Sequence, residues 1–276
     1  MLADFPLTAL LAGRSAEIIE WQQRTAPRRA VLVCLTIIAL GVGCYGFSVG
    51  VWRGLAMGSF VAVKLPLVIM LTLACNGLLN GLLSAVLGTG LGFRQTLQAM
   101  LLSYTVFALI TGALAPVIVF LDWCAPSLRV VTEESRWWHN LMLVLHTLLI
   151  AYAGLLSHVK LLGLVITWAH DRRAAVKAFF AWTLGNLFVG AQMAWVLRPY
   201  FVSPGLEVAF LRPDPMRGNF YETVGMSIAR LLGGLPIFVS AVFIAGIIMG
   251  ALIAISSALA APQESPQKPL THTHKP

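Results

Sequence analysis

The chain contains six long stretches without Asp, Glu, Lys or Arg, and these stretches limit its fold more than any other feature. They cover residues 30–52, 65–93, 95–121, 137–159, 178–197 and 231–263. Each holds at least 20 residues, and an α-helix needs about 20 apolar residues to cross the ~30 Å hydrocarbon core of a bilayer. A lone strand cannot satisfy its backbone hydrogen bonds in lipid. The sequence therefore predicts an all-α protein, a polytopic transmembrane helical bundle of about six spans.

The composition agrees with this class. Hydrophobic residues make up 58% of the chain and charged residues only 11%, whereas about 25% of the residues in a soluble domain are charged. The alternating segments of about ten residues that mark a membrane β-barrel are absent. The net charge of +8 comes from cations in short loops beside the spans, where anionic lipids favour them. We therefore expect the lipid bilayer as a partner and no nucleic-acid binding.

We divide the chain into a segment before the spans, the bundle, and a tail. Residues 1–29 are predicted to form an N-terminal amphipathic, cytoplasmic segment, with Leu7, Leu10, Leu11 and Ile18 near one face. This segment either lies on the membrane surface or folds against the bundle. The bundle covers residues 30–261, and residues 262–276, rich in Pro, Gln and His, are predicted to be disordered. The spans are expected at about 30–52, 65–87, 96–121, 138–160, 178–197 and 235–259, with a polar loop at 198–230.

The distribution of Lys and Arg gives the expected orientation. A cytoplasmic N-terminus places 11 of these residues inside and 8 outside, and the cluster at residues 24–29 flanks the first span, which usually carries the most weight. The inside set is Arg14, Arg24, Arg28, Arg29, Arg94, Lys160, Arg172, Arg173, Lys177, Lys268 and Lys275. The outside set is Arg53, Lys64, Arg129, Arg136, Arg198, Arg212, Arg217 and Arg230. The loop at 198–230 would then be extracytoplasmic.

The densest polar segment of the chain reads WVLRPYFVSPGLEVAFLRPDPMRGNFYE over residues 195–222. Its three arginines stand among three acids, so the charges either neutralise one another in a folded loop or form a binding surface of the aromatic and Arg type. Asn219 followed by Glu222 has the spacing of a helix N-cap. The candidate interaction residues are Trp195, Arg198, Pro199, Arg212, Arg217, Asn219, Tyr221 and Glu222.

The same residues resemble a signature of an uncharacterised bacterial family of multi-pass inner-membrane proteins. The chain has GAQMAWVLRPYFVSPGLEVAFLR and then GNFYE, where that family has GxQxxWxLRPF, SPG, FR and NFYE, and Tyr200 replaces the Phe of LRPF. The second and third spans, KLPLVIMLTLACNGLLNGLL and FRQTLQAMLLSYTVFALITGALAPVI, are loosely similar to Yip-domain membrane proteins. The resemblance covers roughly residues 60–222 and implies a helical bundle in the bacterial inner membrane. It supplies no catalytic residue.

Inside the spans, the polar residues are neutral. Every Asp and Glu lies outside the six stretches, whereas proton- and cation-coupled transporters generally place acids at mid-membrane. Asn76 and Asn80 share one face of the second span and are expected to bond across helices, to Asn186 or Gln192, or else to line a polar path. The histidine expected at mid-span is His146, which we interpret as structural. The candidate intramembrane polar residues are Asn76, Asn80, His146, Asn186 and Gln192.

Glycines recur every four residues, as at Gly46, Gly50, Gly54 and Gly58, and again at Gly77 and Gly81. Such ridges let two helix backbones approach closely. They serve either packing within one bundle or a homo-oligomer interface, and both interpretations stay open.

Taken together, these patterns favour an integral membrane scaffold or a partner-binding component of the bacterial inner membrane, with a membrane protein as partner. A transporter or channel for a small solute is the alternative. A third interpretation, a membrane enzyme acting on lipid, would depend on His139 or Glu134. No HExxH or GxSxG motif is present, so no catalytic residue, metal site or cofactor is predicted.

Overall fold

The structure, a computed structural model, describes residues 4–128, 131–201, 203–204 and 206–233. The predicted span at 235–259 and the tail at 262–276 lie outside these residues. The described part is all-α and contains eight helices. Five of them are long and apolar enough to cross a membrane, which confirms the predicted fold class. These five are α3 (Pro27–Val51), α4 (Leu55–Val86), α5 (Phe93–Cys124), α6 (Glu133–Trp168) and α7 (Arg172–Val196).

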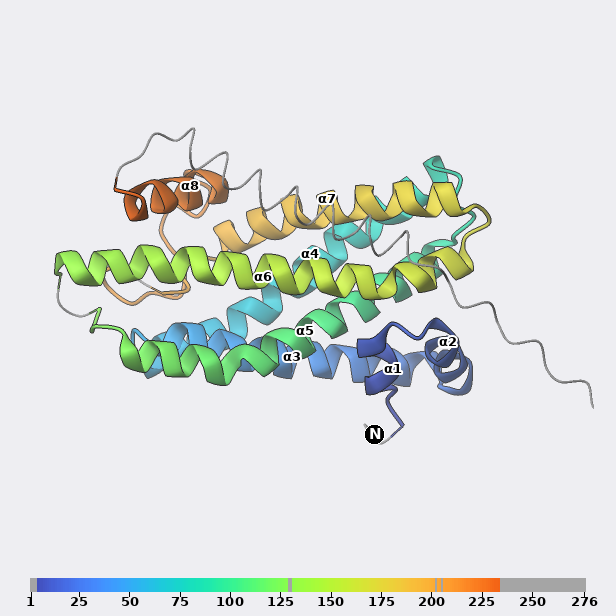
Figure 1. Cartoon of the computed structure of the whole chain (residues 1–276), viewed down its shortest axis with the longest axis horizontal. Helices are drawn as coiled ribbons and strands as arrows, with labels where there is room; N and C mark the ends of the chain where they lie inside the picture. Colours follow the sequence, from blue (N-terminus) through green and yellow to red (C-terminus); the bar gives the residue numbers. More distant parts are fainter. Residues whose placement is uncertain (1–3, 129–130, 202, 205, 234–276) are drawn as a thin grey trace, which may run out of the picture.

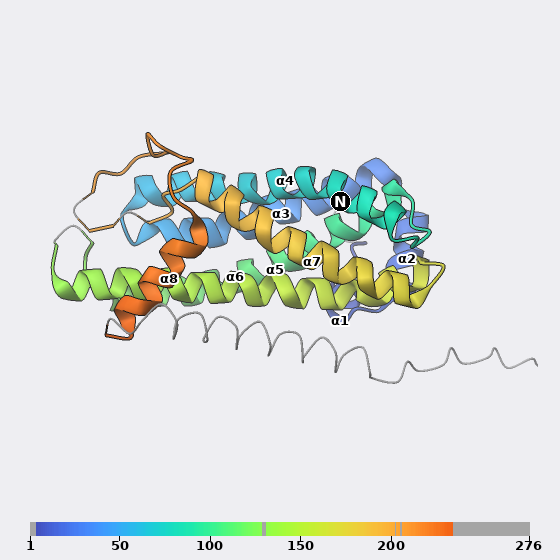
Figure 2. The same cartoon turned by 90° about the horizontal axis from the view of Figure 1, so that it is seen from above.

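The five long helices lie side by side and alternate in direction (Figures 1 and 2). Helix α3 packs on α4 and α5, α4 packs on α7, and α6 joins α5 to α7. One end of the bundle, here called the N-terminal end, carries α1, α2 and the short connections at 87–92 and 169–171. The opposite end, the loop end, carries the connections at 52–54 and 125–132, the segment 197–219 and helix α8 (Phe220–Leu231).

The N-terminal segment forms two short helices, α1 (Leu7–Ala12) and α2 (Ser15–Arg24), packed against the bundle. Ala9, Leu10 and Ile18 are buried in a cluster with residues of α3, α5 and α6. The break between the helices falls at Gly13, whose φ of 73° suits glycine. A side chain there would also meet the carbonyl of Lys160 at 2.8 Å.

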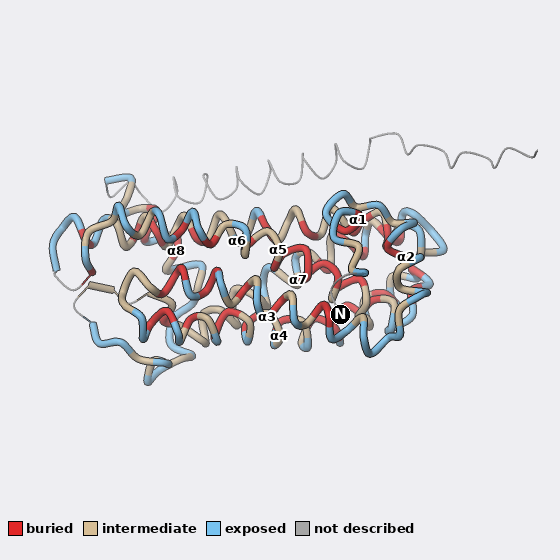
Figure 3. Tube along the Cα trace, turned by 90° about the horizontal axis from the view of Figure 1, so that it is seen from below, coloured by how far each residue is buried: buried red, intermediate tan, exposed pale blue. Residues whose placement is uncertain are grey.

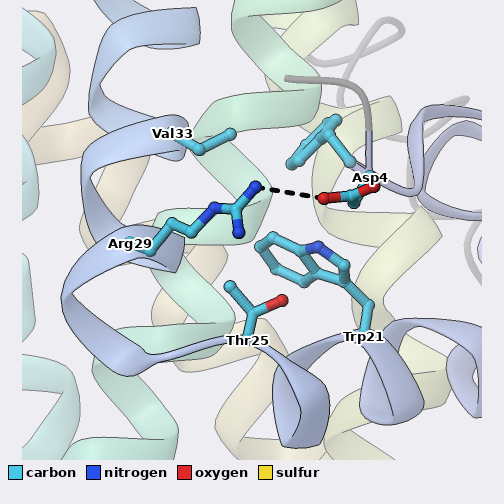
Figure 4. Close-up of a pocket in the computed structure, with 6 residues that line it drawn as sticks. Asp4, Trp21, Thr25, Arg29 and Val33 are labelled. Atoms are coloured by element: carbon cyan, nitrogen blue, oxygen red, sulfur yellow. Dashed lines mark hydrogen bonds and ion pairs between the residues drawn. The ribbon is translucent and has the colours of Figure 1, made fainter. Parts of the chain in front are cut away.

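An ion pair ties the start of the chain to the first span. The Arg29 guanidinium of α3 lies 3.0 Å from the Asp4 carboxylate, beside the ring of Trp21 (Figure 4). The pocket that these residues line has a cavity volume of only about 10 Å³, which is room for a single water molecule. The ion pair therefore anchors the N-terminal segment, and the pocket is too small for an organic ligand.

All five described spans are longer than the sequence predicts, and α4 and α6 exceed the prediction most. Helix α4 starts at Leu55 instead of residue 65, so that Lys64 lies inside the helix and is completely buried. Helix α6 covers Glu133–Trp168 instead of 138–160, and Lys160 lies within it. The spans hold 25 to 36 residues, or about 38–54 Å at 1.5 Å per residue. This exceeds the ~30 Å core, so the helices project beyond it or tilt.

The outer faces of the spans are apolar. Buried positions gather where the helices face one another, and exposed positions occupy the flanks and both ends (Figure 3). Large apolar side chains that point outward are between 62% and 82% exposed, namely Leu40, Leu78, Leu82, Val86, Phe120 and Leu184. An outward surface of this kind is what a bilayer covers.

The glycine ridge of α3 is used inside the bundle. A Cβ added to Gly46 would lie 2.5 Å from the carbonyl oxygen of Val61, and one added to Gly50 would lie 2.6 Å from that of Met57. Both carbonyls belong to α4, which returns after the turn at 52–54. The glycines therefore let α3 and α4 pack backbone against backbone.

Candidate functional site

Arg198 closes the polar loop onto the end of α7. Its Nη1 atom donates to the carbonyls of Trp195 at 2.9 Å and Pro215 at 2.6 Å. Its Nη2 atom donates to those of Asp214 and Arg217, both at 3.0 Å. The guanidinium also stacks over the Trp195 ring, 3.9 Å from its centroid, while the indole N–H of Trp195 donates to the Arg217 carbonyl at 3.1 Å. We call this arrangement of Trp195, Arg198 and residues 214–217 the Arg198 latch.

Two further cations hold the same loop from the bundle side. Nη2 of Arg53, in the α3–α4 turn, donates to the carbonyl of Leu206 at 2.8 Å. Nζ of Lys64, on α4, donates to the carbonyl of Pro199 at 2.8 Å and lies 4.9 Å from the centroid of the Phe210 ring. Backbone carbonyls outside regular secondary structure are free to accept hydrogen bonds from side chains, and here they accept from Arg53 and Lys64. This explains how Lys64 is accommodated inside a helix that its charge was expected to interrupt.

The arginines of the loop do not pair with its acids. Among the described residues, ion pairs occur only at the N-terminal end, at Arg14–Glu17, Arg24–Glu20 and Arg29–Asp4. In the described part of the loop, backbone carbonyls and not carboxylates are therefore the hydrogen-bond partners of Arg198. Burial lowers the pKa of Arg198, the charge of Arg212 lowers it further, and Asp214 opposes both. Arg212 also repels Lys64.

The outer part of the loop, residues 206–217, combines exposed apolar side chains with two arginines and two exposed acids, Glu207 and Asp214. Met216 is 78% exposed, and the guanidinium groups of Arg212 and Arg217 make no hydrogen bond or ion pair to a described residue. The exposed apolar side chains are Leu206, Val208, Phe210, Leu211 and Met216. We call residues 206–217 the outer loop.

The beginning of the loop is inserted into the bundle. The Phe201 ring packs against Trp52 of the 52–54 turn and against His139 and His146 of α6, with centroid distances of 6.0, 5.0 and 5.7 Å. His146 is buried, and its Nδ1 atom lies 3.0 Å from the hydroxyl of Tyr45. His139 and His146 thus serve as packing partners of Phe201. No three His, Cys, Asp or Glu side chains of the described ranges come together as a metal site.

Asn219 begins helix α8, as its spacing to Glu222 predicts. The Glu222 N–H donates to Asn219 Oδ1 at 2.8 Å, and Asn219 Nδ2 donates to the Glu222 carboxylate at 3.3 Å. The hydroxyl of Tyr221 donates to the Leu187 carbonyl of α7 at 3.3 Å. Helix α8 packs on α6, which it crosses in Figure 2. Of the predicted interaction residues, Asn219, Tyr221 and Glu222 therefore build a helix inside the segment that was predicted to be a loop.

A second polar region lies inside the bundle, where α5, α6 and α7 meet. Nδ1 of His158 lies 2.8 Å from the Gly154 carbonyl, which can only accept, so Nδ1 carries the hydrogen. Nε2 then accepts from Nδ2 of Asn186 at 2.6 Å. Oδ1 of Asn186 accepts from the Tyr104 hydroxyl at 3.3 Å. The hydroxyl of Ser103 lies 3.4 Å from His158 Nδ1. We call this set the His158 network.

Asn76 and Asn80 of α4 lie beside this network but do not join it. Both are completely buried. Asn80 Nδ2 contacts the Met100 sulfur at 3.4 Å, while neither amide atom of Asn76 has a hydrogen-bond partner in the part of the chain that the structure describes. The prediction that they bond to Asn186 or Gln192 is wrong, since Asn186 binds Tyr104 and His158 instead. Gln192, on α7, is half-buried, and its side chain makes no hydrogen bond to a described residue.

Three residues of these sites were not predicted from the sequence: His158, Arg53 and Lys64. His158 stands at the end of the charge-free stretch 137–159, so its place in a span could have been noticed. The roles of Arg53 and Lys64 depend on contacts with residues more than 100 positions away, and no local pattern carries that information.

Fold and site together define a multi-pass helical membrane protein with a cation-braced loop at one end and a neutral polar centre. No family model, no curated protein and no solved structure matches the chain. The resemblance of the loop to a bacterial inner-membrane family therefore stays a prediction.

Proposed function

We propose that the protein is a scaffold of the bacterial inner membrane that binds a protein partner through the outer loop, residues 206–217. The observation that carries this proposal is a difference between Arg198 and the other two arginines of the loop. The Arg198 guanidinium donates hydrogen bonds to four backbone carbonyls of its own segment. Arg212 and Arg217 have no such partners among the described residues, and they remain for contacts with another molecule.

Rigidity of the base supports this role. A loop that is ordered before binding loses less conformational entropy when a partner docks. The Arg198 latch, the Arg53 and Lys64 contacts and the insertion of Phe201 all fix the base of the outer loop before any partner arrives.

The chemistry of the outer loop suggests the kind of partner. Arginine and large apolar or aromatic side chains are enriched at binding hot spots, and Phe210, Leu211 and Met216 are exposed beside Arg212 and Arg217. Complementary charge raises association rates and excludes wrong partners. We infer an acidic, partly apolar segment of a second membrane or periplasmic protein.

The proposed orientation places the N-terminus in the cytoplasm and the loop end outside. The distribution of Lys and Arg supports this orientation, above all Arg24, Arg28 and Arg29 beside the start of α3. The proposed inner-membrane location is the one that the loop signature implies.

The test is site-specific photo-crosslinking in intact bacterial membranes, with a photoreactive residue at Met216. A partner should give one adduct of defined mass, and the double variant Arg212→Ala/Arg217→Ala should reduce that adduct at least ~10-fold, because its charge contacts are gone. Arg198 is left intact because its loss would unfold the loop itself.

Two controls separate binding from general damage. Arg136→Ala removes an exposed cation at the same end of the bundle, outside the outer loop, and should leave the adduct unchanged. The same photoreactive residue at Trp123, which is 87% exposed at the end of α5, should not give it. An adduct that persists in the double variant, or none at Met216, would overturn the proposal.

A further inference from the structure

Three residues of α4 form a buried polar ridge that the fold leaves unsatisfied. Thr72, Asn76 and Asn80 follow one another at intervals of four, so they share one face of the helix. They are between 0% and 2% exposed. Among the described residues, four of their polar atoms have no hydrogen-bond partner: Thr72 Oγ1, both amide atoms of Asn76, and Asn80 Oδ1. Buried polar groups are nearly always paired, so four unpaired atoms on one ridge call for a functional explanation.

Helix α7 faces this ridge with glycines. A Cβ added to Gly185 would lie 3.8 Å from the side-chain oxygens of both Asn76 and Asn80. A Cβ added to Gly190 would lie 3.7 Å from Thr72. No side chain of α7 therefore stands over these polar atoms at the two glycines. The indole nitrogen of Trp182, one turn before Asn186 on α7, is also buried and has no hydrogen-bond partner in the described ranges.

The neighbouring His158 network cannot supply the missing partners. Its donors and acceptors are already matched in a fixed direction, from Asn186 to His158 and from Tyr104 to Asn186. Tyr104 is near enough to Asn76 to interact with it, but neither Asn76 amide atom reaches hydrogen-bond geometry with a described residue. The ridge thus offers an amide donor, amide acceptors and a hydroxyl to something else.

We propose that this α4–α7 seam binds a small uncharged solute that carries both hydrogen-bond donors and acceptors, of the urea or short-polyol type, and lets it cross the membrane. Every polar side chain named at the seam is an amide, a hydroxyl, an indole or an imidazole, and none is an acid or a cation. An ion at this depth would need a counter-charge, which these side chains do not provide. A neutral solute can satisfy amide and hydroxyl groups without one. This inference is independent of partner binding by the outer loop.

The test measures the permeation of urea and of glycerol into proteoliposomes that contain the full chain, by light scattering after an osmotic step. Wild-type protein should raise the rate for at least one probe several-fold over protein-free vesicles. Asn76→Leu should lower that increment at least ~10-fold. Leu79→Ala, a change at a 48% exposed position of the same helix, should leave it unchanged.

Gly185→Ala keeps the test decisive if Asn76→Leu does not fold. Its new methyl group would lie 3.8 Å from the two amide oxygens, an ordinary van der Waals distance, so the fold accommodates it. The methyl would occupy the seam and should lower permeation several-fold. If the asparagines were only structural, this variant, which keeps both of them, should leave permeation unchanged. Wild-type vesicles no more permeable than empty ones to both probes, or a Gly185→Ala variant as permeable as wild type, would overturn the proposal.

Discussion

The Nε2 atom of His158 lies 2.6 Å from the Nδ2 atom of Asn186, and this contact joins α6 to α7 within the bundle. Because Nδ1 of His158 donates to the Gly154 carbonyl, the imidazole holds a single neutral tautomer. Asn186 in turn presents its oxygen to Tyr104. One asparagine thereby links three helices, α5, α6 and α7, by two hydrogen bonds of fixed direction.

The first prediction concerns this contact. A double-mutant cycle of His158→Ala and Asn186→Ala should give a coupling energy of about 0.6 kcal/mol, and no more than ~1.7 kcal/mol, which is the range of hydrogen bonds between membrane helices. The measurement is unfolding in mixed micelles followed by circular dichroism. The cycle of Asn186→Ala with His146→Ala is the control, because His146 bonds to Tyr45 instead. Equal coupling in both cycles would refute the assignment.

The second prediction concerns the Arg198 latch. Arg198→Ala removes four hydrogen bonds from the guanidinium to backbone carbonyls and the stack on Trp195, and each lost bond to a charged group is worth about 1.5–3 kcal/mol. Limited proteolysis within residues 206–217 should therefore become at least ~10-fold faster. Arg198→Lys should recover little, since an ammonium lacks the planar fork. The Arg217 guanidinium makes no hydrogen bond or ion pair to a described residue, so the Arg217→Ala variant should be cut at the wild-type rate. Faster cutting of that variant would contradict the assignment of a single latch.

The third prediction concerns the glycine ridge. Gly46→Ala and Gly50→Ala place a methyl group 2.5–2.6 Å from carbonyl oxygens of α4, so the helices must separate, and overpacking of this kind costs about 1–3 kcal/mol. Gly154→Ala is the matched control, because nothing lies within 4 Å of its added Cβ. That control should be neutral or stabilise α6 by up to ~1 kcal/mol.

Unfolding and light scattering together distinguish the two interpretations of this ridge. Packing within one bundle predicts lower stability with no change in oligomeric state. A homo-oligomer interface predicts the reverse: the mass of the particle changes, while the free energy of unfolding of the single chain does not.

The sequence predicts the class and most of the spans because lipid imposes a simple rule on charge and length. Helices α3 (Pro27–Val51) and α5 (Phe93–Cys124) end within a few residues of the predicted 30–52 and 96–121. Helix α4 fails this rule at Lys64. Its charge is met by the carbonyl of Pro199, which follows α7 in the chain. Such a contact exists only after the helices have assembled, and the local sequence cannot reveal it.

The candidate site was predictable only in part, because its contacts also form only after the helices have assembled. Arg198 stood out by composition, but whether it faces outward or binds its own loop depends on the path of the chain through residues 214–217. Asn76, Asn80 and Asn186 were recognised as intramembrane amides, yet their pairing depends on how α4 and α7 are rotated about their axes. Helix rotation places His158 next to Asn186, and periodicity in a uniformly apolar helix does not fix it.

The last prediction concerns the pH dependence of the start of α7. The carboxylate of Asp171 accepts from the N–H groups of Ala174 at 3.0 Å and Arg173 at 3.3 Å. The bond from Ala174 and then that from Arg173 lower the pKa of Asp171 below its ordinary value of 3.8. A pKa that is lower in the folded state means that the cap is fully stabilising above the unfolded value and is lost as the pH falls through the folded value. Hydrogen exchange at Ala174, corrected for intrinsic rates, should therefore be constant from about pH 7 to 5 and become less protected below about pH 3.8. Asp171→Asn keeps an acceptor oxygen without a titrating group, so its protection should not fall there, and an identical fall in this variant would show that another group is responsible.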